Sequence, residues 1–136
     1  MHTPQVTEHF ENPRNIGTID DADGTATIGS AASGEMLKLT LKISNGAVVA
    51  AKFKAFGCPT AIASGSVLTE LVTGSRISDA LKITASHISK ALGGLPADKQ
   101  RYATYAEKVL KTAIENSLSK QETHLRNLRQ KKRLHS

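Results

Sequence analysis

Residues 36–56 read MLKLTLKISNGAVVAAKFKAF, and this stretch decides the fold. From residue 36 to residue 44, apolar and polar side chains alternate, which is the period of a strand with one buried and one wet face. Asn45-Gly46 follows at once, a pair that tolerates the positive φ angles of a two-residue hairpin turn. Residues 48–56 form a second alternating run, whose apolar members are Val49, Ala51, Phe53 and Ala55. The sequence therefore predicts an antiparallel hairpin with a single apolar face.

The segments on either side of this hairpin are predicted to form a third strand and the helices that cover the sheet. Before it we expect a short helix over residues 3–10, a turn-rich loop up to Gly24 and a short strand over residues 25–28. After it, helical patterns cover residues 60–73, residues 84–92 and a long segment that begins near Pro96. Strands followed by helices indicate an α+β fold, in which helices cover one face of a small, about three-stranded antiparallel sheet.

The charge of the chain is concentrated at one end. The 136 residues carry a net charge of +6. Residues 1–117 hold 12 Lys and Arg against 11 Asp and Glu, whereas residues 118–136 hold 6 against 1. We therefore divide the chain into a nearly neutral domain, residues 1–117, and a basic helical extension or disordered tail, residues 118–136, in which the last helix frays. A nucleic-acid-binding domain would spread its positive charge over a face, so nucleic acid is not an expected partner.

Three features bear on the compartment. The sequence has no apolar run near the ~18–20 residues that a membrane span needs. The first residues lack the basic start and apolar stretch of a signal peptide. Cys58 is the single cysteine, so an internal disulfide is excluded. We expect a cytoplasmic protein that does not bind membranes.

Cys58 lies where a strand gives way to a helix. In Gly57-Cys58-Pro59, backbone N–H groups and the positive end of the helix dipole favour a thiolate and lower the thiol pKa. Most free cysteines are instead small buried apolar residues, and the local pattern leaves both interpretations open. The five histidines do not pair at metal-binding spacing, so spacing alone predicts no zinc site.

Three sequence motifs occur in the order and at the spacing of a known protein family. Residues 11–17 read ENPRNIG, residues 56–64 read FGCPTAIAS and residues 92–99 read LGGLPADK. They resemble the E-N-P-R-N-x-G, F-G-C-x-x-A-I-A-S and L-G-G-L-P-P-x-K motifs of the iron–sulfur cluster assembly scaffold family, the IscU type and the N-terminal domain of NifU. The resemblance spans about residues 5–118 and implies a small α+β domain.

The same resemblance implies that most metal ligands have been replaced. Scaffolds of this family use three cysteines, with an aspartate and a histidine nearby, to hold zinc or a [2Fe–2S] cluster. By this resemblance, Ser33 stands at the first cysteine and Glu35 at the aspartate, while the second cysteine is kept as Cys58. Arg101 and Tyr102 stand at the histidine and the third cysteine.

These replacements change what the site can bind. Cluster iron needs thiolate or mixed Cys and His ligands, and the fixed positive charge of Arg101 repels a metal ion. We expect no intact [2Fe–2S] cluster within one chain, and at most weak binding of iron or zinc by Cys58 and Glu35. We hypothesise that Arg101 and Tyr102 fill the former ligand pocket and that Glu35 pairs with Arg101.

The resemblance implies a role in iron–sulfur cluster assembly, and the ligand losses favour a non-classical or accessory member that docks to pathway partners. We do not expect an enzyme. Two alternatives stay open: a metal-free persulfide sulfur carrier through Cys58, and a paralogue without cargo that regulates a cysteine desulfurase complex. A homo-oligomer that shares a cluster between chains also stays open.

The implied partners are a cysteine desulfurase or other iron–sulfur assembly proteins. The family's Hsp70-type chaperones recognise a Leu-Pro-Pro-Val-Lys segment. Residues 95–99 keep only part of it, with Lys99 as the residue for partner docking, and this argues against chaperone docking.

Overall fold

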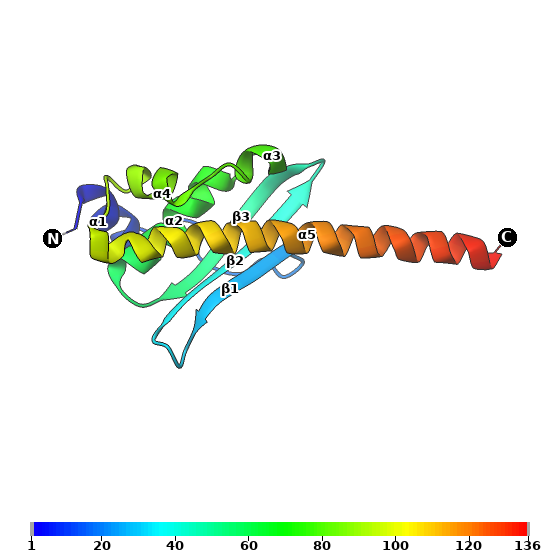
Figure 1. Cartoon of the computed structure of the whole chain (residues 1–136), viewed down its shortest axis with the longest axis horizontal. Helices are drawn as coiled ribbons and strands as arrows, with labels where there is room; N and C mark the ends of the chain where they lie inside the picture. Colours follow the sequence, from blue (N-terminus) through cyan, green and yellow to red (C-terminus); the bar gives the residue numbers. More distant parts are fainter. Residues whose placement is uncertain (1, 136) are drawn as a thin grey trace.

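The structure is a computed structural model that describes residues 2–135, a three-stranded antiparallel sheet with helices packed against it (Figure 1). Its elements are α1 (Pro4–Glu11), β1 (Gly24–Ser30), β2 (Glu35–Ser44), β3 (Ala47–Phe56), α2 (Pro59–Val72), α3 (Ile77–Ala80), α4 (Ala85–Ala91), a 3₁₀ turn (Ala97–Lys99) and α5 (Gln100–His135). The predicted α+β class, the three-stranded sheet and the long C-terminal helix are confirmed.

The central hairpin forms as its sequence predicts. The strand order is β1-β2-β3 with both pairs antiparallel. Asn45 and Gly46 have φ angles of 53° and 75°, the left-handed values of a tight two-residue turn. The turn places Ser44 opposite Ala47 and starts the register of the β2–β3 pair.

The apolar alternation of β3 fails at one residue. A β-bulge lies between Lys42 and Ile43, where Lys42 pairs with Ala50 but Ile43 pairs with Val48. The extra residue on β3 is Val49, which is turned to solvent, while Val48 is fully buried. The prediction that Val49 belongs to the buried face is therefore wrong, because a bulge reverses the faces beyond it.

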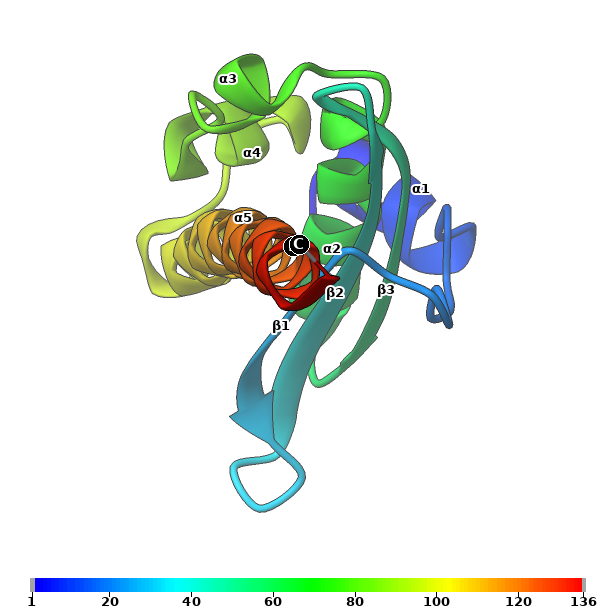
Figure 2. The ribbon, with the colours of Figure 1, turned by 90° about the vertical axis from the view of Figure 1, so that its right-hand side faces the viewer.

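Two helices cover the apolar face of the sheet. α5 packs on β1 and β2, while α2 packs mainly on β3, and both lie on the same side of the sheet (Figure 2). Gly65 sets how closely α2 approaches: a Cβ atom there would collide with the ring of Phe53. The buried core between these layers is aliphatic, with Phe53 as its largest side chain.

The opposite face of the sheet is not wet throughout. Residues 12–23 run along the outer edge of β3, where Gly17 donates to the carbonyl of Phe53 over 2.9 Å. The same segment then reaches the polar face, and the backbone N–H of Ile19 donates to Thr40 Oγ1 over 3.0 Å. Thr40 is consequently 2% exposed, which corrects the expectation that the polar side chains of β2 all meet water.

α5 differs from its prediction at its start. The helix begins at Gln100, because residues 97–99 form a 3₁₀ turn after Pro96. Up to residue 131, Ser117 is its last buried residue, and the helix continues to His135. Ser136 lies outside the described residues. Among residues 2–135, no helix combines the length and hydrophobicity needed to cross a membrane.

Candidate functional site

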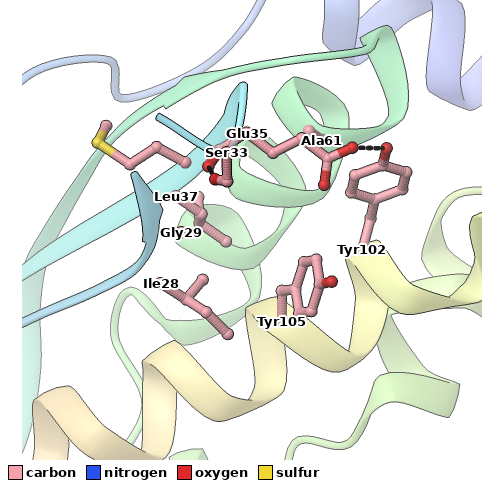
Figure 3. A pocket seen from close by; sticks show the side chains of 9 residues that line it. Ile28, Gly29, Ser33, Glu35, Leu37, Ala61, Tyr102 and Tyr105 are labelled. Carbon is pink, nitrogen blue, oxygen red and sulfur yellow. Dashed lines mark hydrogen bonds between the residues drawn. The ribbon is translucent and has the colours of Figure 1, made fainter. Parts of the chain in front are cut away.

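Three chain segments far apart in the sequence meet at one end of the sheet. Glu35 opens β2, Cys58 is the residue that precedes α2, and Tyr102 lies in the first turn of α5. Figure 3 shows the side chains of Glu35 and Tyr102 pointing toward one another, with Ala61 of α2 beside them. The α+β layering therefore assembles a polar cluster from residues that the sequence separates by up to 67 positions.

A glycine makes this approach sterically allowed. Gly57 has a φ angle of +133°, a conformation that residues with a side chain rarely adopt. A Cβ atom built there would lie 3.4 Å from Cγ of Glu35. Gly57 thus lets the end of β3 turn into α2 close to Glu35, and this turn positions Cys58.

The Tyr102 hydroxyl is the centre of the cluster. Tyr102 is 3% exposed, and its hydroxyl donates to Glu35 Oε1 over 2.6 Å. Arg101 Nη2 donates to the same hydroxyl oxygen over 2.7 Å and lies 3.4 Å from Glu35 Oε1. The expected pairing of Glu35 with Arg101 is present, and it is accompanied by a shorter bond from Tyr102.

These contacts fix the charge states of Glu35 and Tyr102. The hydrogen bond from Tyr102 is the main cause that holds the pKa of the Glu35 carboxyl below its ordinary value, with Arg101 adding to it. Burial, followed by the neighbouring Cys58 and Glu35, raises the pKa of the Tyr102 phenol well above its ordinary value. At neutral pH the pair is therefore a carboxylate that accepts a hydrogen bond from a neutral phenol.

Cys58 is half-buried beside this pair. Its burial acts to raise the pKa of the thiol. The Tyr102 hydroxyl, the backbone amides at the start of α2 and the charge of Lys99 act in the opposite direction and outweigh burial. The thiol pKa therefore lies below its ordinary value, as the position of Cys58 at a helix start leads one to expect.

Two cations lie against the Tyr102 ring. The guanidinium carbon of Arg101 is 4.5 Å from the ring centroid and Lys99 Nζ is 5.9 Å from it. Both distances are within the range of a cation–π contact. Lys99, which the sequence indicates only as a docking residue, therefore also contributes positive charge to the cluster.

Ser33 belongs to the turn and not to the polar cluster. It lies between β1 and β2, and its Oγ donates to the carbonyl oxygens of Ser30 and Glu35, over 2.9 Å and 3.0 Å. The hydroxyl thus closes the hairpin turn. Of the five ligand positions that the sequence singles out, the structure brings together Glu35, Cys58, Arg101 and Tyr102, while Ser33 lines a cavity with Glu35 and Tyr102.

A mostly apolar cavity of about 230 Å³ lies directly beneath the cluster. Tyr105 forms part of its wall and meets the Tyr102 ring edge-on, with 6.1 Å between the centroids (Figure 3). The sequence motifs do not mark Tyr105 as a site residue. Its spacing of three residues from Tyr102, which puts both rings on one helical face, is the signal that could have found it.

The cluster offers few donors to a metal ion. Across the part of the chain that the structure describes, no three His, Cys, Asp or Glu side chains are grouped so that they could hold one. Cys58 and Glu35 are the two candidate donors, and one oxygen of Glu35 already accepts hydrogen bonds from Tyr102 and Arg101.

Comparison with known proteins identifies the family. The family described as NifU-like N terminal domain matches residues 1–124. The chain belongs to this family. The NifU-like domain thus covers the whole sheet, the cluster and most of α5, and the resemblance found in the three sequence motifs is confirmed.

Relatives of this NifU-like domain include named scaffold proteins. The iron–sulfur cluster assembly scaffold protein IscU 1 of Archaeoglobus fulgidus is 41% identical over 114 residues, which cover 84% of this chain and 74% of the relative. The corresponding IscU of Aquifex aeolicus is 39% identical over 122 residues, covering 88% and 78%. A Drosophila melanogaster relative, 41% identical over 131 residues, covering 93% and 84%, is named an iron–sulfur cluster assembly enzyme IscU.

Solved structures show the same fold. A SUF-system scaffold candidate from Fervidobacterium islandicum superposes with a TM-score of 0.62 at 16% identity, over 83% of this chain and 96% of that chain. An N-terminal NifU-like protein from Brucella abortus gives a TM-score of 0.54 at 23% identity, over 85% and 81%. These likenesses support the α+β architecture alone.

The thiol of Cys58 provides a test of this geometry. Replacing Tyr102 with phenylalanine removes a hydroxyl that favours the thiolate, so the Cys58 pKa should rise. The rate of alkylation by iodoacetamide, measured against pH, should show its midpoint move upward. Tyr105→Phe is the matched control, since that hydroxyl has no part in the cluster, and should leave the midpoint in place. An unchanged midpoint in Tyr102→Phe would contradict the assignment.

Proposed function

We propose that this NifU-like domain is a non-classical or accessory component of iron–sulfur cluster assembly, which docks to pathway partners and does not build a cluster alone. The names of its relatives support a role in iron–sulfur cluster assembly. One observation supports the proposal that the chain does not build a cluster alone: the Glu35 carboxylate already accepts a 2.6 Å hydrogen bond from Tyr102 and faces the guanidinium of Arg101.

The donor set does not fit an iron–sulfur cluster. Such clusters are held by four ligands, usually thiolates, and Cys58 is the single thiol of the chain. Ser33 and Tyr102 carry hydroxyls whose protons are too tightly held to replace thiolates readily. Arg101 adds a permanent positive charge, which disfavours a second cation at the same place. Weak binding of iron or zinc by Cys58 and Glu35 is the most that these residues support.

The cluster has a structural use of its own. It ties the β1–β2 end of the sheet to the start of α5 through Tyr102 and Glu35, next to the start of α2. In a scaffold, a bound metal would join the same three segments. Internal hydrogen bonds between a neutral phenol, a carboxylate and a guanidinium make that joint without a metal. Lys99 lies at the edge of this joint, and we propose it as a residue of the docking surface.

Anaerobic reconstitution with iron and sulfide tests the proposal. The wild-type chain should develop no stable visible absorption band. A variant that combines Ser33→Cys, Arg101→His and Tyr102→Cys restores the family's ligand types and should gain a band, with about two irons per chain or dimer.

The same triple variant with Cys58→Ala is its matched control and should lose that band. A stable band with about two irons per chain or dimer in the wild type would contradict the proposal.

A specific observation favours one second function, metal-free sulfur transfer through Cys58. The thiol pKa is lowered, which raises the fraction of nucleophilic thiolate above that of an ordinary cysteine. The thiolate would attack the outer sulfur of a donor persulfide; the donor's S–S bond breaks, its thiolate leaves and Cys58 keeps a persulfide. No net oxidation is needed.

Incubation with a cysteine desulfurase and cysteine separates the two functions. An accessory docking protein should bind the desulfurase, as measured by calorimetry, while the mass of the Cys58 peptide stays unchanged. A sulfur carrier should gain the mass of one sulfur atom at Cys58, and Cys58→Ser should abolish the gain. Absence of both binding and mass gain would contradict both functions.

A further inference from the structure

The outer part of α5 stands away from the domain. Figure 1 shows the helix continuing past the sheet, and every residue from 118 to 131 is exposed. At 1.5 Å per residue, these 14 residues span about 21 Å. We call residues 118–131 the projecting segment.

The projecting segment carries an apolar stripe with a regular spacing. Leu118, Leu125 and Leu128 are 44%, 48% and 43% exposed. Together with Gln121 they follow a 3-4-3 spacing, which is that of the core positions of a two-stranded coiled coil, and they lie within about 80° of the helix circumference. A single polar residue at such a position is a known means of setting register.

Positive charge lies on both sides of this stripe. Arg126 and Arg129 lie on one side and Lys131 on the other; Glu122, the one acidic residue among residues 118–136, lies on the side of the two arginines. Helix positions beside the core of a coiled coil select the partner by charge. The complementary surface is therefore an apolar stripe flanked by acidic residues.

We propose that the projecting segment is a docking site for an acidic amphipathic helix of a partner protein. A second copy of this chain is a poor occupant, because residues 118–136 have a net charge of +5 and two such helices repel one another. An anionic membrane is also disfavoured, because the stripe is narrow and residues 118–136 contain no aromatic residue.

The domain extends this docking site at its base. Gln121 also lines a groove of about 410 Å³ that includes Ile43 and Ile77. The rest of the groove lining is mostly polar, so a helix lying along the stripe would meet the domain beside a mixed polar and apolar groove. This gives the proposed partner an end point, so its length is set by the projecting segment.

The test uses the full chain and a fluorescent synthetic helix of two heptads, the length of the projecting segment, with leucine at the core positions and glutamate at the flanking positions. A second peptide with lysine at the flanking positions is its matched control. In fluorescence anisotropy, the acidic peptide should bind at least about tenfold more tightly than the basic one. Rising salt should weaken this binding.

Two substitutions test whether the peptide binds to the leucine stripe. Leu125→Ala combined with Leu128→Ala should weaken acidic-peptide binding by about tenfold or more, since anchor side chains dominate such interfaces. Alanine keeps the helix, so loss of folding does not explain a weaker complex. Leu81→Ala removes a leucine of similar exposure, 40%, elsewhere on the domain and should change nothing.

Three results would overturn the proposal. The first is an acidic peptide that fails to bind or binds no better than the basic one. The second is tighter binding of anionic phosphatidylglycerol vesicles, which displace the peptide. The third is a dimer, seen in sedimentation, that the two leucine substitutions dissociate. None of these results depends on metal or sulfur chemistry, so failure here leaves the proposed function in cluster assembly to its own tests.

Discussion

The hydrogen bond from the Tyr102 hydroxyl to Glu35 is the contact on which the candidate site depends. It joins the first residue of β2 to the first turn of α5, and both residues lie next to Cys58 at the start of α2. The hydroxyl has one proton to donate, so Glu35 and Cys58, when ionised, compete for its hydrogen bond.

Much of the fold could be predicted from the sequence, because periodicity and turn chemistry are local. The alternation before Asn45-Gly46 identifies the hairpin, and the small aliphatic side chains after Cys58 identify α2. Val49 and Thr40 could not be predicted in the same way. A bulge reverses the face of Val49, and a loop from another part of the chain covers Thr40, so both depend on tertiary packing. The short helix α3 likewise has no periodic signal over its four residues.

The site was predictable to a similar extent. The motif around Cys58 and the replaced positions Arg101 and Tyr102 are visible in the sequence, and opposite charges on Glu35 and Arg101 suggest their pairing. The sequence does not tell that the phenol of Tyr102 makes the shorter bond, because that depends on the burial of its ring. Nor does it place Tyr105 on the cavity wall, since this requires the β1–β2 hairpin to lie opposite α5.

The charge of the chain now has two separate uses. Arg101 and Lys99 neutralise a carboxylate within the domain, while the surplus on α5 faces solvent beyond it. The central claim concerns the first use: Oε1 of Glu35 is engaged by Tyr102 and Arg101, so Glu35 is at most a weak ligand for a metal ion. Carbon-13 NMR of the Glu35 side-chain carboxyl, titrated with pH before and after one equivalent of Zn²⁺, tests this most directly. The account predicts a pKa below the ordinary glutamate value and a signal that Zn²⁺ leaves unchanged. An ordinary pKa, or a Zn²⁺-dependent shift of the Glu35 signal, would contradict it.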